Sequence, residues 1–175
     1  MSKPVRRADQ RGVATLVFLV VLACAAAFIW QSSQGLPARV ASHFVGSGTA
    51  NGFMPRDRYV QFMLGFAVGL PLVLVFLSSA AFNSPGARLN LPNREYWLAP
   101  ERRAATIAVL RRHMATAGTM LVVFLAYVHW MVVRANAIDP PHLPEPWFMD
   151  GLALFVLAML AWGIALVLRF SKVPR

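Results

Sequence analysis

The sequence predicts an all-α membrane protein with four transmembrane helices. Three observations carry this prediction: four long apolar runs, basic residues concentrated in alternate connections, and aromatic residues gathered at one set of span ends. Hydrophobic residues form 58% of the chain and charged residues 14%, against about 45–50% and about 25% in a soluble domain. We therefore expect a lipid bilayer to be the main partner of this 175-residue chain.

Each apolar run is long enough to cross a bilayer. The hydrocarbon core is about 30 Å thick, and about 20 helical residues cross it at about 1.5 Å each. The expected spans are residues 12–30, 59–82, 113–133 and 147–168, within a single domain over residues 1–175. A cleaved signal peptide is the alternative for the first run, because small residues surround Cys24. The apolar stretch continues to Trp30, which favours a span.

The distribution of Lys and Arg predicts the orientation. Thirteen of the 17 lie in the N-terminal tail, the connection between the second and third runs, and the C-terminal tail. The others are Arg39, Arg56, Arg58 and Arg134. Because Lys and Arg remain on the cytoplasmic side, we expect a bacterial inner-membrane protein with both termini in the cytoplasm. The formal charge of +10 is then explained by attraction of the basic residues to anionic lipid headgroups, and no nucleic-acid partner is expected.

Aromatic residues support the same layout. Amphipathic rings prefer the headgroup level of a bilayer. Five of them fall at the outer ends of the expected spans: Trp30, Tyr59, Tyr127, Trp130 and Trp147. The sequence therefore predicts an outer aromatic belt.

The connection over residues 31–58 is long, and long loops in compact proteins tend to be functional. Residues 36–45 are expected to run extended after Pro37. A turn follows, since glycine and Asn51 adopt positive φ at low cost. The chain is expected to re-enter a helix near Pro55, because proline suits a first helical position. This arrangement predicts a structured outer loop that caps the mouth of the bundle.

The same loop carries a resemblance to a known family. The pattern comprises Leu36-Pro37, Val40, His43-Phe44 and Gly48-Thr49-Ala50-Asn51-Gly52-Phe53. It resembles the signature loop of small bacterial multi-pass membrane proteins, the domain that forms the N-terminal part of SdpI-type immunity proteins. That pattern usually ends Gly-x-Pro-Asp-Gly-Trp, and this chain has Ala50, Asn51 and Phe53 at the variable places. Residues 89–103 look like four-span members of the family. The likeness implies an integral membrane protein, with an immunity or receptor role.

The loop supplies the first set of candidate ligand-binding residues: His43, Phe44, Gly48, Asn51 and Gly52. The imidazole of His43 can titrate, bind a metal or donate a hydrogen bond. A loop-ordering hydrogen bond to nearby backbone is the favoured interpretation. Contact with a ligand or peptide, and metal binding, are the alternatives.

His129 and Asp150 are the remaining ligand-binding candidates. Each lies about one helical turn inside the outer end of its span, so the two share a depth. An ionisable residue within a span marks a functional site by default, and we name these two as the candidate pair. The interpretation favoured over pairing is that Asp150 lies at the interface and stabilises the N-terminal end of its own helix.

The connection over residues 83–112 is expected to be cytoplasmic. Pro100 suits the start of a helix that continues into the third span. An amphipathic segment with a basic face contacts anionic lipid or docks a partner. The candidates for such contact are Arg94, Tyr96, Trp97, Arg102 and Arg103.

No catalytic constellation, phosphate-binding loop or metal-ligand spacing is readable, so we expect no enzyme activity, no cofactor and no metal site. Gly65 and Gly69 form a small-xxx-small pair. Packing within the bundle is the favoured role of such a pair, and a homo-oligomer is the alternative. The leading hypothesis is an immunity- or receptor-like membrane protein that contacts a ligand through the outer loop. The alternative is an accessory subunit of a larger membrane complex.

Overall fold

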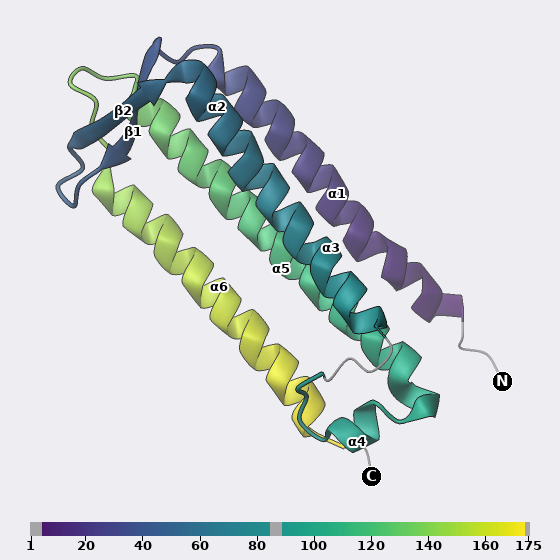
Figure 1. Cartoon of the computed structure of the whole chain (residues 1–175). Coiled ribbons are helices and arrows are strands. Elements are labelled where there is room, and N and C mark those ends of the chain that lie inside the picture. Colours follow the sequence, from purple (N-terminus) through teal and green to yellow (C-terminus); the bar gives the residue numbers. More distant parts are fainter. Residues whose placement is uncertain (1–4, 85–88, 174–175) are drawn as a thin grey trace.

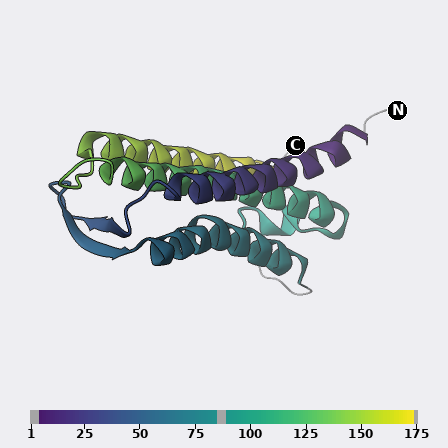
Figure 2. The ribbon, with the colours of Figure 1, turned by 90° about the horizontal axis from the view of Figure 1, so that it is seen from above.

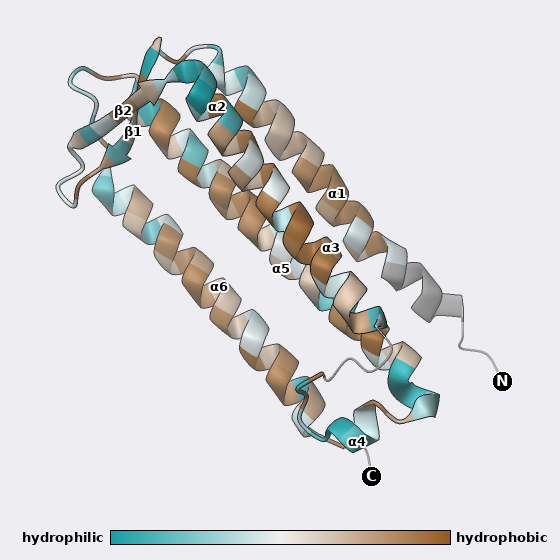
Figure 3. Cartoon of the chain, viewed as in Figure 1, coloured by the Kyte–Doolittle hydropathy of each residue, from teal (hydrophilic) through white to brown (hydrophobic). Residues whose placement is uncertain are grey.

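The computed structural model describes residues 5–84 and 89–173. It confirms the fold class: four long apolar helical segments that can each cross a membrane, with a two-stranded hairpin between the first and second (Figure 1). The segments are α1 (Val5–Ser33), the continuous run of α2 (Arg56–Leu64), η1 (Gly65–Gly69) and α3 (Leu70–Asn83), then α5 (Pro100–Ala135), and α6 (Glu145–Ser171). Apolar residues follow their length, and polar residues gather toward their ends (Figure 3).

The bundle has two distinct ends. At one, here called the hairpin end, strands β1 (Arg39–Phe44) and β2 (Ala50–Pro55) lie beside the connection between α5 and α6 (Figure 1). At the other, here called the terminal end, α1 begins, α6 ends and the short helix α4 (Arg94–Trp97) lies (Figure 1). The connections therefore alternate between the two ends, and the even number of spans places the start of α1 and the end of α6 at the same end.

Helix α5 is central to the bundle, since it contacts α1, α3 and α6 (Figure 2). Two buried apolar clusters lie along it. The hairpin-end cluster is Ile29, Leu36, Val40, Tyr59, Val60, Met63, Ala67, Leu125 and Val132. The second cluster is Phe18, Leu22, Ala25, Val75, Ala115 and Val122. Because α6 contributes to neither, the core is built from α1, the α2–α3 segment, α5 and the hairpin.

The expected continuity of the third helix is confirmed. Pro100 stands in the first turn, and the helix runs for 36 residues to Ala135. At about 1.5 Å per residue it is roughly 54 Å long, well beyond the thickness of a hydrocarbon core. Its first part therefore projects past the apolar region at the terminal end.

The second span contains one turn of π-helix. Pro71 has no backbone N–H, so the regular helical ladder cannot continue through it. The N–H of Leu70 instead bonds the carbonyl of Gly65, and the turn widens over Gly65–Gly69. A Cβ at Gly65 or Gly69 would meet no atom within 4 Å. The prediction that this pair serves close packing inside the bundle is therefore wrong.

Helix α6 lies against α5 through stacked rings. Phe124 and Phe155 stack with centroids 4.3 Å apart, and Trp162 donates to the carbonyl of His113 at 3.2 Å. At the hairpin end Trp130 stacks on Trp147 at 6.2 Å. Aromatic contacts thus fix α6 along much of its length.

The hairpin is antiparallel and irregular. Val40 faces Met54, and Phe44 faces Ala50, with shifts in register on either side of His43. Exposure alternates along β2, whose odd-numbered residues are the exposed ones. The extended segment and the helix entry predicted for this loop are therefore present. The turn is shorter than predicted, because Asn51 and Gly52 lie in a second strand that no sequence pattern indicated, and the positive φ falls at Gly48.

Candidate functional site

The inner face of the hairpin closes the bundle. Val40 is fully buried in the hairpin-end cluster, and Phe44 and Met54 pack against that cluster. Phe44, a predicted ligand contact, therefore serves the fold. Because these apolar side chains leave water together, the hairpin is held as a lid rather than as a free loop.

Asn136, the residue after α5, clamps β1 from its free edge. Its Oδ1 accepts from the Ala41 N–H at 2.8 Å, and its Nδ2 donates to the Ala41 carbonyl at 2.9 Å. The same Nδ2 lies 2.9 Å from the carbonyl of Val132. One amide side chain thus takes the place of a neighbouring strand and ties β1 to the end of α5. Asn136 belongs to no motif, so the sequence gives no local signal of this role.

The tip of the hairpin is fixed by Gly48. Its φ of +76° suits glycine, and a Cβ there would lie 2.8 Å from the His142 ring. Its carbonyl accepts from the Leu143 N–H at 2.8 Å, and Thr49 bridges to His142. Gly48, predicted as a ligand contact, is buried. Its role here is close approach of two backbones.

The outer face of the hairpin carries four exposed residues: Arg39, His43, Asn51 and Phe53. Nδ1 of His43 lies 2.5 Å from Oδ1 of Asn51. The amide oxygen can only accept, so Nδ1 carries the proton, and in the neutral imidazole Nε2 is left as an acceptor. The guanidinium of Arg39 lies 5.4 Å from the centre of the Phe53 ring. This outer face offers a cation, an imidazole acceptor, an amide and an aromatic ring.

The structure thus brings three of the candidate residues, His43, Asn51 and Gly52, together. Gly52 faces His43 across the strands, and a Cβ on it would lie 2.8 Å from the His43 Cβ. The loop-ordering hydrogen bond of His43 exists, but its partner is the side chain of Asn51 rather than backbone. Glycine is required at position 52 because the two strands approach each other closely beside the His43 side chain.

A buried polar cluster lies beneath the hairpin, where three helices meet. His129 of α5 is fully buried and joins Ser32 of α1 and Tyr59 of α2. Its Nε2 lies 2.8 Å from Ser32 Oγ, and its Nδ1 lies 2.9 Å from Tyr59 OH. Ser32 Oγ donates to the Phe28 carbonyl at 2.6 Å.

These contacts fix one direction for the protons. Ser32 gives its proton to Phe28, so its oxygen accepts from Nε2–H of His129. Nδ1 then accepts from the hydroxyl of Tyr59. Each polar group of this cluster therefore has a hydrogen-bond partner, as buried polar groups require. Ser32 is therefore not poised as a nucleophile, because its proton is directed away from the imidazole.

Two predictions at this depth are wrong. His129 does not pair with Asp150, since Ser32 and Tyr59 hold both ring nitrogens and Asp150 is exposed. Tyr59 does not belong to the outer aromatic belt, because its side chain is only 2% exposed. The other belt residues fit better: Trp130 and Trp147 stack on each other, with Arg134 over both rings.

At the terminal end, Trp97 fixes α4 to the end of α6. Its indole N–H donates to the Phe170 carbonyl at 2.8 Å, and the two rings meet edge to face at 5.3 Å. Asn93, with φ +51°, adds donors to the Phe170 and Ser171 carbonyls. Trp97, predicted as a lipid or partner contact, is thus engaged in the fold. Asn93 was missed, although asparagine tolerates positive φ.

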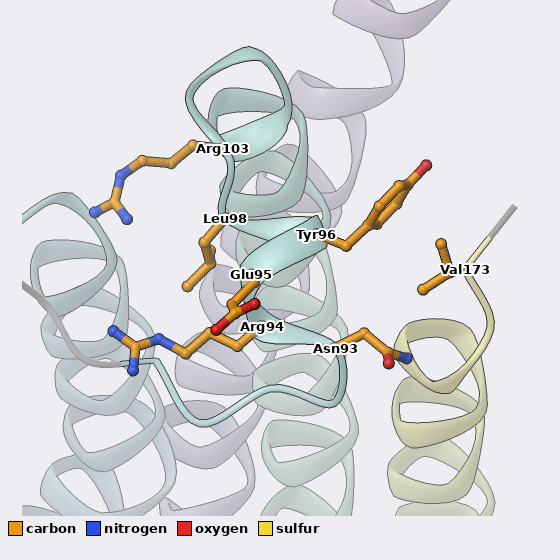
Figure 4. A pocket seen from close by; sticks show the side chains of 7 residues that line it. All are labelled: Asn93, Arg94, Glu95, Tyr96, Leu98, Arg103 and Val173. Carbon is orange, nitrogen blue, oxygen red and sulfur yellow. The ribbon is translucent and has the colours of Figure 1, made fainter.

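Three of the other predicted terminal-end residues, Arg94, Tyr96 and Arg103, line a hollow of about 880 Å³. Arg94 and Arg103 extend to one side of it and Tyr96 to the other (Figure 4). Arg102 lies 4.1 Å from the Tyr96 ring centre and pairs with Glu101 at 2.9 Å. Within residues 12–84 and 89–173 this is the single ion pair, so Arg94 and Arg103 keep their charges unpaired there.

Among the described residues, no three His, Cys, Asp or Glu side chains lie close enough to hold a metal ion. The chain matches no protein-family model, no curated protein and no solved structure.

Proposed function

We propose that this chain is a non-enzymatic, multi-pass protein of the bacterial inner membrane that binds a peptide through its hairpin. The supporting observation is the contrast between the two faces of the hairpin. The inner face is locked by the core, Asn136 and Leu143, while the outer face exposes Arg39 and His43 beside Asn51 and Phe53. A rigid surface of this kind binds without a large ordering cost.

The proposed orientation places the hairpin outside the cell and both termini in the cytoplasm. The count of basic residues supports it, because the connections at the terminal end carry most of the Lys and Arg. A peptide that reaches the membrane from outside then meets the hairpin first.

Strand addition is the proposed mode of binding. Asn136 occupies the free edge of β1, whereas β2 has no further strand beside it among the described residues. An extended peptide pairs with such an edge through its backbone, and neighbouring side chains select its sequence. The exposed His43, Asn51 and Phe53 stand beside that edge as the selecting groups.

An immunity- or receptor-like role follows from this mode. The resemblance of residues 36–53 to the SdpI-type loop supports it, as does the position of the motif residues His43 and Asn51 on one exposed face. In such a role the hairpin captures a harmful or signalling peptide at the outer surface.

The test replaces Phe53 with a photo-crosslinking amino acid in the full-length chain in living cells. The cells are then exposed to a labelled, secreted peptide that permeabilises the inner membrane. We expect a crosslinked adduct and improved survival over cells that lack the chain. His43→Ala and Asn51→Ala should each reduce both readouts, because one removes the exposed acceptor and the other frees the imidazole.

Arg58 provides the matched control, since it is exposed at the hairpin end and lies outside the hairpin. The crosslinker at Arg58 should give no adduct, and Arg58→Ala should leave survival unchanged. Equal survival of the parent chain, His43→Ala and Asn51→Ala would contradict the proposal.

An accessory subunit of a larger membrane complex is the second candidate. The observation that favours it is the exposure of α6. No residue in its most apolar stretch is buried, and among the long helices its packing is on α5. Purification from membranes in mild detergent distinguishes the two. A stoichiometric integral-membrane partner, lost when Leu154→Arg and Leu157→Arg are introduced on the exposed face of α6, would favour the subunit.

A further inference from the structure

A second cavity at the terminal end differs from the one around Tyr96. It measures about 570 Å³ and lies between three spans. Thr15 comes from α1, Asn83 ends α3, and the rest of the lining comes from the first part of α5. Its charged residues are Arg103, Arg111 and Arg112. Among the residues whose side chains the structure describes, no carboxylate lines this cavity, whereas Glu95 lines the other hollow.

The depth of this cavity follows from the sequence. Thr15 lies near the beginning of the first candidate span, which starts at Gly12. Asn83 is the last residue of the second. Arg112 is the last charge before the apolar part of α5. Three independent span boundaries thus line one cavity, which places it at the level where an apolar core gives way to phosphate headgroups.

The lining also changes character within the cavity. Ala104, Ile107 and Ala108 form an apolar wall on α5. The arginines provide planar donors that match phosphate oxygens. Thr15 and Asn83 add a hydroxyl and an amide. An apolar wall beside guanidinium groups fits a molecule that has a negatively charged phosphate at one end and a hydrocarbon chain at the other.

We propose that this cavity binds the headgroup of an anionic phospholipid in the membrane leaflet at the terminal end. The phosphate lies against Arg111 and Arg112, with Arg103 as a third cation, and the beginning of an acyl chain lies along Ile107. Basic pockets between transmembrane helices recognise lipid headgroups in this way. This inference does not depend on peptide binding by the hairpin at the other end of the bundle.

The test uses the full-length chain in detergent micelles, with native mass spectrometry to count bound lipids. Phosphatidylglycerol and phosphatidylcholine with identical acyl chains are the probes. We expect selective retention of phosphatidylglycerol. The double variant Arg111→Gln/Arg112→Gln should weaken that binding about 10- to 30-fold, since each juxtamembrane arginine is worth about a fivefold change in affinity.

Arg169→Gln/Lys172→Gln is the matched control, because it removes two positive charges from the same end but outside the cavity. It should change the affinity by less than about threefold. An equal loss in both double variants would overturn the proposal, since it would indicate a diffuse surface attraction rather than a site.

A second variant guards against misfolding of the arginine variants. Ala108→Phe fills the cavity and keeps every charge, and it should also abolish selective retention of phosphatidylglycerol. Full retention in Ala108→Phe would overturn the proposal. A final arm adds millimolar inorganic phosphate. Displacement of the lipid by free phosphate would assign the cavity to a soluble anion instead, and unchanged lipid binding supports the lipid.

Discussion

Individual residues at the hairpin end act through polar groups that are buried but paired. His129 joins α1 and α2 to α5 because its two ring nitrogens have different roles, one donating and one accepting. A polar side chain in an apolar surrounding is costly when a partner is lost. The cluster therefore favours one arrangement of the three helices.

Adjacent serines allow a sharp test of this interpretation. Ser32→Ala leaves Nε2–H of His129 without an acceptor, and we expect a loss of about 1 kcal/mol in the free energy of unfolding. Ser33 is also buried, but its hydroxyl has no partner among the described residues. Ser33→Ala should therefore be neutral or stabilising. Denaturant titration of the protein in micelles measures both, and equal losses would contradict the assigned roles.

Asn136 gives a second prediction for a single residue. Asn136→Ala removes both hydrogen bonds to Ala41, so we expect faster amide hydrogen exchange in β1 and β2 with the exchange of α5 preserved. Asn136→Asp keeps the acceptor and loses the donor, and its effect should be intermediate. Unchanged exchange in the hairpin of Asn136→Ala would show that the apolar face alone holds it.

The wrong partner predicted for His129 has a physical cause. Distance along the chain from a span end gives the depth of a residue, and on that basis His129 and Asp150 match. Depth says nothing about the direction in which a side chain leaves its helix. Ser32 and Tyr59 lie at the same depth, and their side chains point toward His129. No local sequence pattern indicates the direction in which these side chains point.

Whole elements were easier to predict than residue partners. Spans follow from the length of apolar runs, and the unbroken α5 follows from Pro100 and the absence of a later proline within it. Strand β2 was missed because Asn51, Gly52 and Pro55 have low strand propensity. Its pairing comes instead from burial of Val40 and Met54 on the bundle, which a local pattern does not contain.

Glycines in the helices provide a prediction at this scale. A Cβ at Gly118 would lie 2.6 Å from Val75 and 2.9 Å from Phe18. Gly118→Ala should therefore force α1 and α3 away from α5 and lower the free energy of unfolding by about 1–3 kcal/mol. Gly65 is open, so Gly65→Ala should raise it by up to about 1 kcal/mol through helix propensity.

Thermal unfolding in micelles, followed by circular dichroism, compares the two glycine variants. Opposite signs are expected. A destabilising Gly65→Ala together with a lowered tendency to self-associate would instead indicate that Gly65 packs against another copy of the chain.

At the scale of the whole molecule, the charge distribution supports the proposed orientation. The structure groups the connections into two ends, and the basic residues separate along the same division. The division of the basic residues could be found in the sequence because Lys and Arg near the ends of the spans direct membrane insertion.

The orientation yields a direct prediction. A cytoplasm-active fluorescent reporter fused after Arg175 should be active, and a cysteine introduced at Ser47 at the hairpin tip should react with a membrane-impermeant reagent in intact cells. A cysteine introduced at Asn90 provides the control and should react only after permeabilisation. The reverse pattern of labelling would place the hairpin in the cytoplasm.

The absence of α6 from both buried clusters bears on how the chain is made. Synthesis passes Ala135 with every member of those clusters already available, so the core can assemble while the last span is still on the ribosome. The fastening of Gly48 to Leu143 comes later, when the α5–α6 connection emerges. The order of synthesis therefore permits two steps, in which the buried clusters form first and the hairpin tip is fastened second.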